Sequence, residues 1–165
     1  MVSKRIVVTG MGAVTPLGSA VETVWQRLLA GQSGVGALPE ELVGDLAVRI
    51  GGRVPDAIQD PEAGFDPDLL LPPKEQRKMD RFILFAIAAA QEALRQAAWS
   101  PDTPEAQERT ATIIASGVGG FPAMVEAVRT TDSRGPRRLS PFTIPTWQPG
   151  MCLSCMASRA RWVRP

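Results

Sequence analysis

The chain has 165 residues, of which 44% are hydrophobic and 21% charged, a composition typical of a globular protein and not of a disordered one. The formal net charge of +1 gives no general attraction to nucleic acid, and no apolar run suits a signal-peptide core or a membrane span, so we expect a cytoplasmic protein that binds neither nucleic acid nor membrane. Histidine is absent, which excludes catalysis by histidine within this chain.

The first predicted element is a buried β-strand that ends in a glycine-rich turn. It lies in Arg5-Ile-Val-Val-Thr-Gly-Met-Gly-Ala-Val-Thr-Pro-Leu-Gly18, where three β-branched residues precede the glycines. Ser19, with Glu22 three residues later, predicts a capping box. The apolar residues that follow have helical spacing, which predicts an amphipathic helix over residues 19–30 with Trp25 in the core.

The glycine-rich turn has an alternative interpretation as a dinucleotide-binding loop, because glycines between a strand and a helix can hold a pyrophosphate. Gly10 and Gly12 have the first spacing of that motif, but Val14, Thr15 and Pro16 stand where its third glycine should fall. The spacing therefore favours a different use for this loop.

The middle of the chain predicts one long helix after an irregular excursion. Residues 32–68 are rich in glycine, proline and aspartate and contain one strand-like segment, Leu46–Ile50. A basic segment at residues 71–81 leads into Phe82–Ala98, which is apolar almost all round and is therefore expected to be buried. A second buried strand is predicted at Thr110–Ala115, and a helix at Pro122–Arg129 follows a glycine turn.

Four segments resemble β-ketoacyl-[acyl-carrier-protein] synthases of type II, in the order and spacing of that family. They are the opening segment up to Gly18, Lys74-Glu-Gln-Arg-Lys-Met-Asp-Arg-Phe82, Ala115-Ser-Gly-Val-Gly-Gly120 and Gly135-Pro-Arg-Arg-Leu-Ser-Pro-Phe142. The resemblance covers residues 4–145. It implies an α/β fold of the thiolase-like type, with layers in the order α-β-α-β-α, of which only part of the amino-terminal half is present.

The resemblance also implies a function, namely condensation of malonyl-carrier protein with an acyl thioester by a homodimer. The family uses a cysteine nucleophile and two histidines, and no cofactor or metal is implied. None of the three catalytic residues falls in the resembling region. Cys152 and Cys155 do not match the family's nucleophile motif, and they lack the context of a redox or zinc site. We therefore predict no catalytic residue in this chain.

The basic residues of the resembling segments are candidates for binding a partner. Lys74, Arg77 and Lys78 match family positions that dock the acidic acyl carrier protein, and Arg137 and Arg138 match a second cluster. Local cations can steer an anionic partner although the whole chain is nearly neutral. The alternative is that they are merely solvated charges. A noncatalytic module that binds carrier protein is the alternative function of the chain.

The tail differs in character from the rest of the chain, so we predict two parts, residues 1–146 and 147–165. Residues 147–165 have no helical or strand period and concentrate Trp, Cys and Arg. Permitted codons for this tail, read after discarding two bases, encode Ala-Ala-Gly-His-Val-Ser-Ile-Leu-Tyr-Gly-Phe-Lys-Gly-Pro-Leu-Gly-Ala-Pro, which resembles the family's continuation. We therefore expect a frameshift after Thr146, and the alternative is a genuine, divergent tail.

Overall fold

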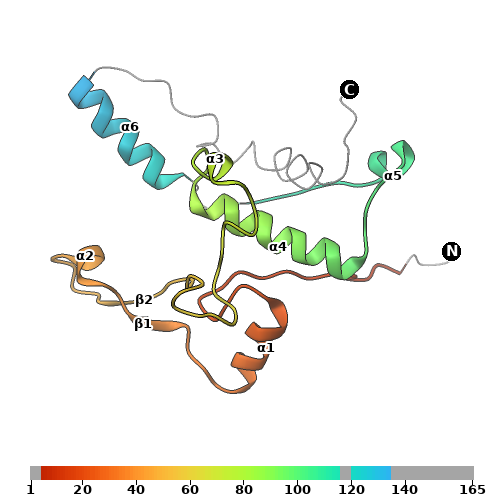
Figure 1. Cartoon of the computed structure of the whole chain (residues 1–165), viewed down its shortest axis with the longest axis horizontal. Helices are drawn as coiled ribbons and strands as arrows, with labels where there is room; N and C mark the ends of the chain where they lie inside the picture. Colours follow the sequence, from red (N-terminus) through yellow and green to blue (C-terminus); the bar gives the residue numbers. More distant parts are fainter. Residues whose placement is uncertain (1–4, 116–119, 135–165) are drawn as a thin grey trace.

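The computed structural model describes residues 5–115 and 120–134, and every structural statement below refers to these. The elements, in chain order, are α1 (Val21–Leu29), β1 (Val35–Ala37), α2 (Glu40–Val43), β2 (Ile50–Gly52), α3 (Pro73–Gln76), α4 (Arg81–Ala97), α5 (Pro104–Glu108) and α6 (Phe121–Arg134) (Figure 1). No helix in this part of the chain has the length and apolar character needed to cross a membrane.

Helix α4 is the central element, with α1 and the β1–β2 hairpin on one side and α3 at its amino-terminal end (Figure 1). Ile83 and Leu84, with Ile87 one turn further along α4, are buried and form a core cluster with Phe65 and Leu71. The sequence predicted that this helix is buried, because it is apolar almost all round; in the described structure Ile83, Leu84 and Ile87 are buried and most of its other residues are half-buried. Besides Phe65 and Leu71 of the irregular segment before α3, the half-buried side chains of Val14, Val54 and Ile114 pack against this cluster.

The amino-terminal segment lies along α4 in an irregular conformation (Figure 1). A Cβ on Gly10 would lie 2.1 Å from the Ala93 carbonyl oxygen, and one on Gly12 would lie 1.8 Å from that of Ala89. Both positions therefore require glycine, because the backbone of the segment touches the backbone of the helix. Close packing of the two backbones therefore accounts for glycine at positions 10 and 12, and it leaves no space at this face of the segment for a pyrophosphate.

The predicted strand at residues 6–8 is wrong for the described structure. Ile6 is 96% exposed and Val8 81%, and no strand of the described residues pairs with them. The second predicted strand, Thr110–Ala115, is likewise irregular, with Ile113 90% exposed. Strands exist through hydrogen bonds to neighbouring strands, so apolar β-branched sequence alone does not make one.

Helix α1 forms where the sequence predicted it, but its start differs from the prediction. Ala20 is the N-cap residue, and its side chain makes no capping hydrogen bond to the helix. Ser19 Oγ instead donates to the carbonyl oxygens of Ala63 and Gly64, and Glu22 accepts from Gln26. The predicted capping box is therefore wrong. Trp25, expected in the core, is 56% exposed.

The only sheet among the described residues is the antiparallel pair β1–β2, in which Val35 faces Gly52 and Ala37 faces Ile50. The strand-like segment predicted at residues 46–50 thus contributes only its last residue to β2. The predicted long helix corresponds to α4 within one residue at each end, and the helix predicted at Pro122–Arg129 corresponds to part of α6.

Candidate functional site

The basic residues of the 74–78 segment lie on a short, exposed turn, which we call the basic turn and which carries Lys74, Arg77 and Lys78. Pro72 and Pro73 start α3, since their fixed φ suits the first positions of a helix. Backbone hydrogen bonds from Lys78 to Glu75 and from Met79 to Gln76, both 3.0 Å, continue the turn as far as α4. All three cationic side chains are exposed.

Gln76 holds the basic turn against the segment that precedes it. Its Nε2 donates to the Leu71 carbonyl oxygen at 2.7 Å, to Asp68 Oδ1 at 2.8 Å and to the Pro67 carbonyl oxygen at 3.1 Å. One amide thus ties three residues of the preceding loop to α3. The cations therefore stand on a fixed backbone, which lowers the entropic cost of presenting them to a partner. Sequence reasoning missed this role, because nothing in a lone glutamine predicts it.

The charges of the basic turn are only partly compensated within the described residues. Lys78 Nζ lies 2.7 Å from Glu75 Oε1 and 2.9 Å from Oε2. No described acidic group forms an ion pair with Lys74 or Arg77. The turn therefore presents three cations and one carboxylate, a local excess of positive charge that the net charge of the chain conceals.

The next cation along the chain, Arg81, is engaged by the fold. Its Nη2 donates to the Val54 carbonyl oxygen at 3.2 Å, and its guanidinium lies 5.2 Å from the centre of the Phe85 ring. Arg81 thus holds the loop after β2 to α4, and although it is also exposed, its guanidinium is engaged by other residues of this chain. The residue before it, Asp80, has a buried Oδ2 with no hydrogen-bond partner among the described residues.

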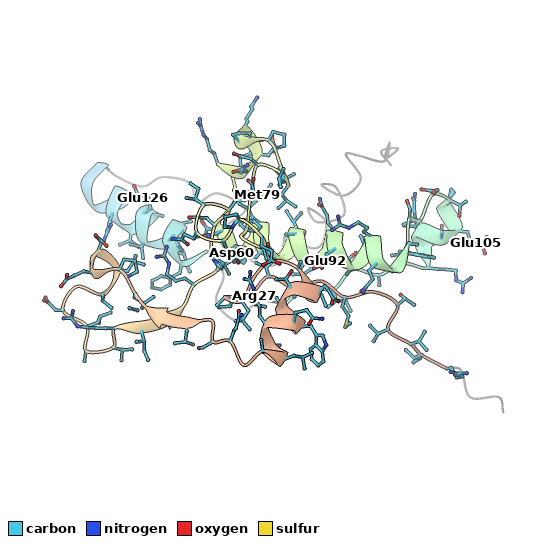
Figure 2. The ribbon with its side chains drawn as sticks, turned by 60° about the horizontal axis from the view of Figure 1, so that its bottom comes forward. Arg27, Asp60, Met79, Glu92, Glu105 and Glu126 are labelled. Atoms are coloured by element: carbon cyan, nitrogen blue, oxygen red, sulfur yellow. The ribbon has the colours of Figure 1, made fainter. Side chains whose placement is uncertain are left out.

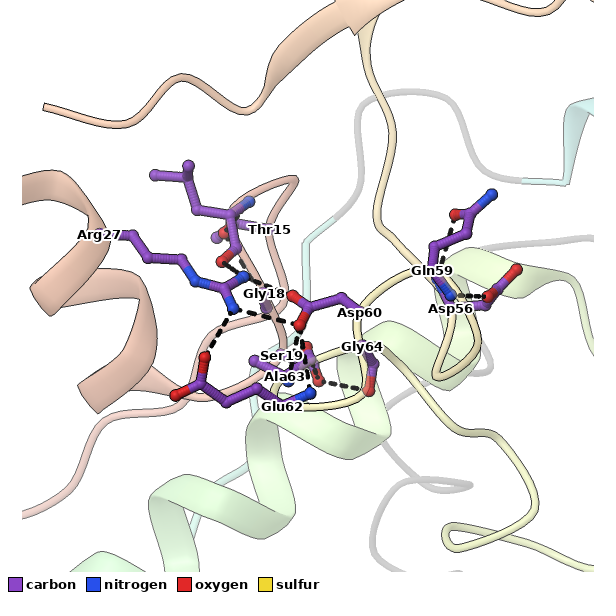
Figure 3. Close-up of polar contacts among 11 residues, drawn as sticks. Thr15, Gly18, Ser19, Arg27, Asp56, Gln59, Asp60, Glu62, Ala63 and Gly64 are labelled. Carbon is purple, nitrogen blue, oxygen red and sulfur yellow. Dashed lines mark hydrogen bonds and ion pairs between the residues drawn. The ribbon is translucent and has the colours of Figure 1, made fainter.

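A second charged cluster, formed by Arg27, Asp60 and Glu62, lies between α1 and the loop before α3 (Figure 3). Arg27 Nη1 donates to Asp60 Oδ2 and to the Leu17 carbonyl oxygen at 2.8 Å, while Nη2 reaches Asp60 Oδ1 at 3.1 Å and Glu62 at 3.2 Å. The hydrogen bonds from Arg27 hold the pKa of Asp60 down at about 2, and the same pair raises the pKa of Arg27.

This cluster is structural. The donors of Arg27 that the carboxylates occupy are not free for a ligand, and Asp60 Oδ1 also accepts the backbone N–H groups of Glu62 and Ala63 at 3.2 Å each. It joins α1 to the 60–64 loop. Neither here nor elsewhere in the described residues do three His, Cys, Asp or Glu side chains come together in a way that could hold a metal ion.

The other candidate residues lie outside the described part of the chain. These are Arg137 and Arg138 of the second basic cluster; Cys152 and Cys155, for which we predict no catalytic role, also lie there. The boundary predicted at residue 146 lies there too. The basic turn is thus the part of the predicted site that the structure describes.

Comparison with known proteins decides the family. The family model "Beta-ketoacyl synthase, N-terminal domain" matches residues 3–160. The chain belongs to the β-ketoacyl synthase family. It is 44% identical over 142 residues to 3-oxoacyl-[acyl-carrier-protein] synthase 2 of Rhizobium meliloti (strain 1021), a match that covers 86% of this chain and 34% of that protein. The chain therefore spans about a third of the length of this curated relative.

Two solved structures place the fold among ketosynthases. A β-ketoacyl synthase from Burkholderia phymatum STM815 matches with a TM-score of 0.65 and 26% identity, over 94% of this chain and 36% of that one. A ketosynthase bound to a hexaketide and in complex with a type II polyketide acyl-carrier protein matches with a TM-score of 0.54 and 22% identity, over 94% and 40%. The prediction of a partial thiolase-like fold is confirmed, and the dinucleotide-binding interpretation of Gly10 and Gly12 is wrong.

Family membership also accounts for the missing strands. The relative from Rhizobium meliloti has about 2.5 times as many residues as this chain, because the 142 matched residues are 34% of its length. A segment of β-branched residues without a paired strand, such as residues 6–8, is expected where neighbouring strands are missing.

Proposed function

We propose that this chain is part of an enzyme that condenses malonyl-carrier protein with an acyl thioester in fatty-acid or polyketide chain elongation. The chain's own contribution is to dock the acyl carrier protein on the basic turn. The observation that carries the proposal is the arrangement at Lys74, Arg77 and Lys78. The three exposed cations lie on one turn that the Gln76 side chain fixes to the preceding loop, whereas the nearby Arg81 donates to the Val54 carbonyl oxygen.

The similar proteins support this partner. The relative from Rhizobium meliloti is named for the acyl carrier protein, and one of the similar structures holds a ketosynthase together with an acyl-carrier protein. Family resemblance assigns docking to the positions of Lys74, Arg77 and Lys78, and it adds Arg137 and Arg138. We also propose, from the same resemblance, that the intact protein is a homodimer and acts in the cytoplasm.

The physics limits the contact to a weak one. Exposed ion pairs contribute about 0.2 to 1 kcal/mol each, so the three cations supply at most about 3 kcal/mol, less than the roughly 4 kcal/mol of a millimolar dissociation constant, and their contribution is salt-sensitive. Weak, fast contacts suit a carrier that must leave after delivering its acyl group. Because the sequence contains no histidine and neither cysteine matches the nucleophile motif, we propose that the chain by itself does not catalyse condensation.

The test is binding of purified acyl carrier protein to the full chain, compared with a charge-reversed variant. Reversal of the turn with Lys74→Glu, Arg77→Glu and Lys78→Glu should abolish binding, and raising the ionic strength should weaken binding of the unmodified chain. A matched control reverses three other exposed cations, Arg53→Glu, Arg95→Glu and Arg109→Glu, which form no ion pair among the described residues.

The control carries the same change in total charge, so it separates a docking surface from a general electrostatic effect. Binding that survives reversal of the basic turn, or that falls equally in both triple variants, would refute the proposal. Circular dichroism of each variant shows whether the helices are retained.

A further inference from the structure

Glu75 is the one acidic residue on the basic turn, and it lies among the cations proposed to dock the carrier protein. Both of its carboxylate oxygens contact Lys78 Nζ, at 2.7 and 2.9 Å. The two side chains are 41% and 45% exposed, so a partner can reach the pair from solvent. An anionic partner and Glu75 therefore compete for the same ammonium group.

The fold does not need Glu75 for the shape of this turn. Pro72 and Pro73 set the start of α3, and the side-chain amide of Gln76 fixes it to the preceding loop. Among the described residues, the only side-chain hydrogen bonds of Glu75 are those to Lys78, three residues later in the turn that follows α3. Its main effect is thus on charge, and it lowers the excess positive charge of residues 74–78 from three to two.

We propose that Glu75 is an internal competitor that tunes carrier-protein docking. In the free protein it holds Lys78, and a carboxylate of the carrier displaces it on binding. The competition lowers affinity and speeds release, which keeps the contact transient. This inference rests on the proposed docking function of the basic turn.

The opposite role for Glu75 is preorganisation, in which it aims Lys78 at the partner. The two roles differ in sign. If Glu75 competes, removing its charge strengthens binding. If it preorganises Lys78, removing its charge weakens binding, because a freed lysine loses more side-chain entropy when it docks.

The experiment compares Glu75→Gln with Glu108→Gln in the full chain. Gln keeps the size of the side chain and removes its charge, and Glu108 is an exposed carboxylate on α5, at the other end of α4 from the basic turn (Figure 1). The dissociation constant of purified acyl carrier protein is measured at several ionic strengths. Glu75→Gln should tighten binding by roughly 1.5- to fivefold at low salt, the range expected for one exposed ion pair.

Two further results are expected of a competitor. The salt dependence of the affinity should become steeper in Glu75→Gln, because the turn then has one more uncompensated cation. Most of the gain should disappear when Glu75→Gln is made in a Lys78→Gln background, since the competition acts through that lysine. Glu108→Gln should leave binding unchanged. Glu75→Ala provides a second variant with the same expected gain.

The outcomes separate this inference from the docking proposal. If charge reversal of the basic turn abolishes binding but Glu75→Gln binds equally or more weakly, the competitor role is wrong and docking stands. An equal gain in Glu108→Gln would also overturn it, because the effect would then be one of total charge. If charge reversal itself has no effect, the docking proposal fails, and this inference fails with it.

Discussion

A single carboxylate, that of Glu92 on α4, is predicted to hold the amino-terminal part of this chain together. Its Oε1 accepts from the backbone N–H of Val21 at 2.8 Å, and its Oε2 from that of Ala13 at 3.0 Å. Val21 is the first residue of α1, so Glu92 provides from another helix the cap that no residue of α1 provides. Figure 2 shows Glu92 on α4, at the side of the helix that faces α1.

The expected loss follows from these two bonds. Hydrogen bonds to a charged group contribute about 1.5 to 3 kcal/mol each, and Glu92 is only partly buried, so values at the low end apply. We expect Glu92→Ala to lower the free energy of unfolding by about 2 to 4 kcal/mol. Glu92→Gln keeps one acceptor oxygen and should cost about half as much, because its NH₂ group faces a second N–H donor.

The assay is urea unfolding followed by circular dichroism and by tryptophan fluorescence, with Glu22→Ala as the control. Glu22 would be a capping residue if the sequence-based capping box were real, but in the structure it only accepts from Gln26 on the helix surface. Its replacement should therefore cost no more than about 0.5 kcal/mol. A Glu22→Ala variant that loses as much stability as Glu92→Ala would refute the reasoning and restore the capping box.

Four further predictions follow from the described residues and the sequence. Hydrogen bonding to Arg27 holds the pKa of Asp60 at about 2, below its usual 3.8, so the ionised carboxylate stabilises the fold above about pH 4. Acid titration should show this contribution to the free energy of unfolding disappearing between about pH 4 and pH 2. The Asp60→Asn variant should lack this pH-dependent loss. Exposed apolar residues such as Ile6 and Ile113 should make the isolated chain bind a hydrophobic dye and aggregate, and a monomer that melts cooperatively without dye binding would contradict this. Incubation of the purified chain with acyl- and malonyl-carrier protein should give no condensation product. Sustained turnover would contradict the proposal that the chain by itself does not catalyse condensation. Resequencing the gene should show a family-like continuation in the shifted frame after the codon of Thr146, and an intact frame without one would favour a genuine tail.

The candidate site was predicted from sequence to the extent that it depends on local chemistry. Lys74, Arg77 and Lys78 follow two prolines at a helix start, and charged side chains in such a place are exposed in almost any context. Gln76 and Arg81 could not be assigned in this way. Their partners lie 5 to 9 and 27 residues away along the chain, and only the folded chain brings them within hydrogen-bond distance.

The sequence by itself determined which residues of this chain form the long helix. The apolar run before Trp99 gave α4 to within one residue, because helical periodicity and a turn signal are local properties. The glycines at positions 10 and 12 predicted a turn, whereas only the structure shows that they let the backbone touch α4 at Ala93 and Ala89. The tertiary structure decided the rest. Glu92, and not Ser19, caps α1, and residues 6–8 form no strand. A cap supplied by another helix and a strand both depend on partners distant in sequence, which local patterns do not reveal.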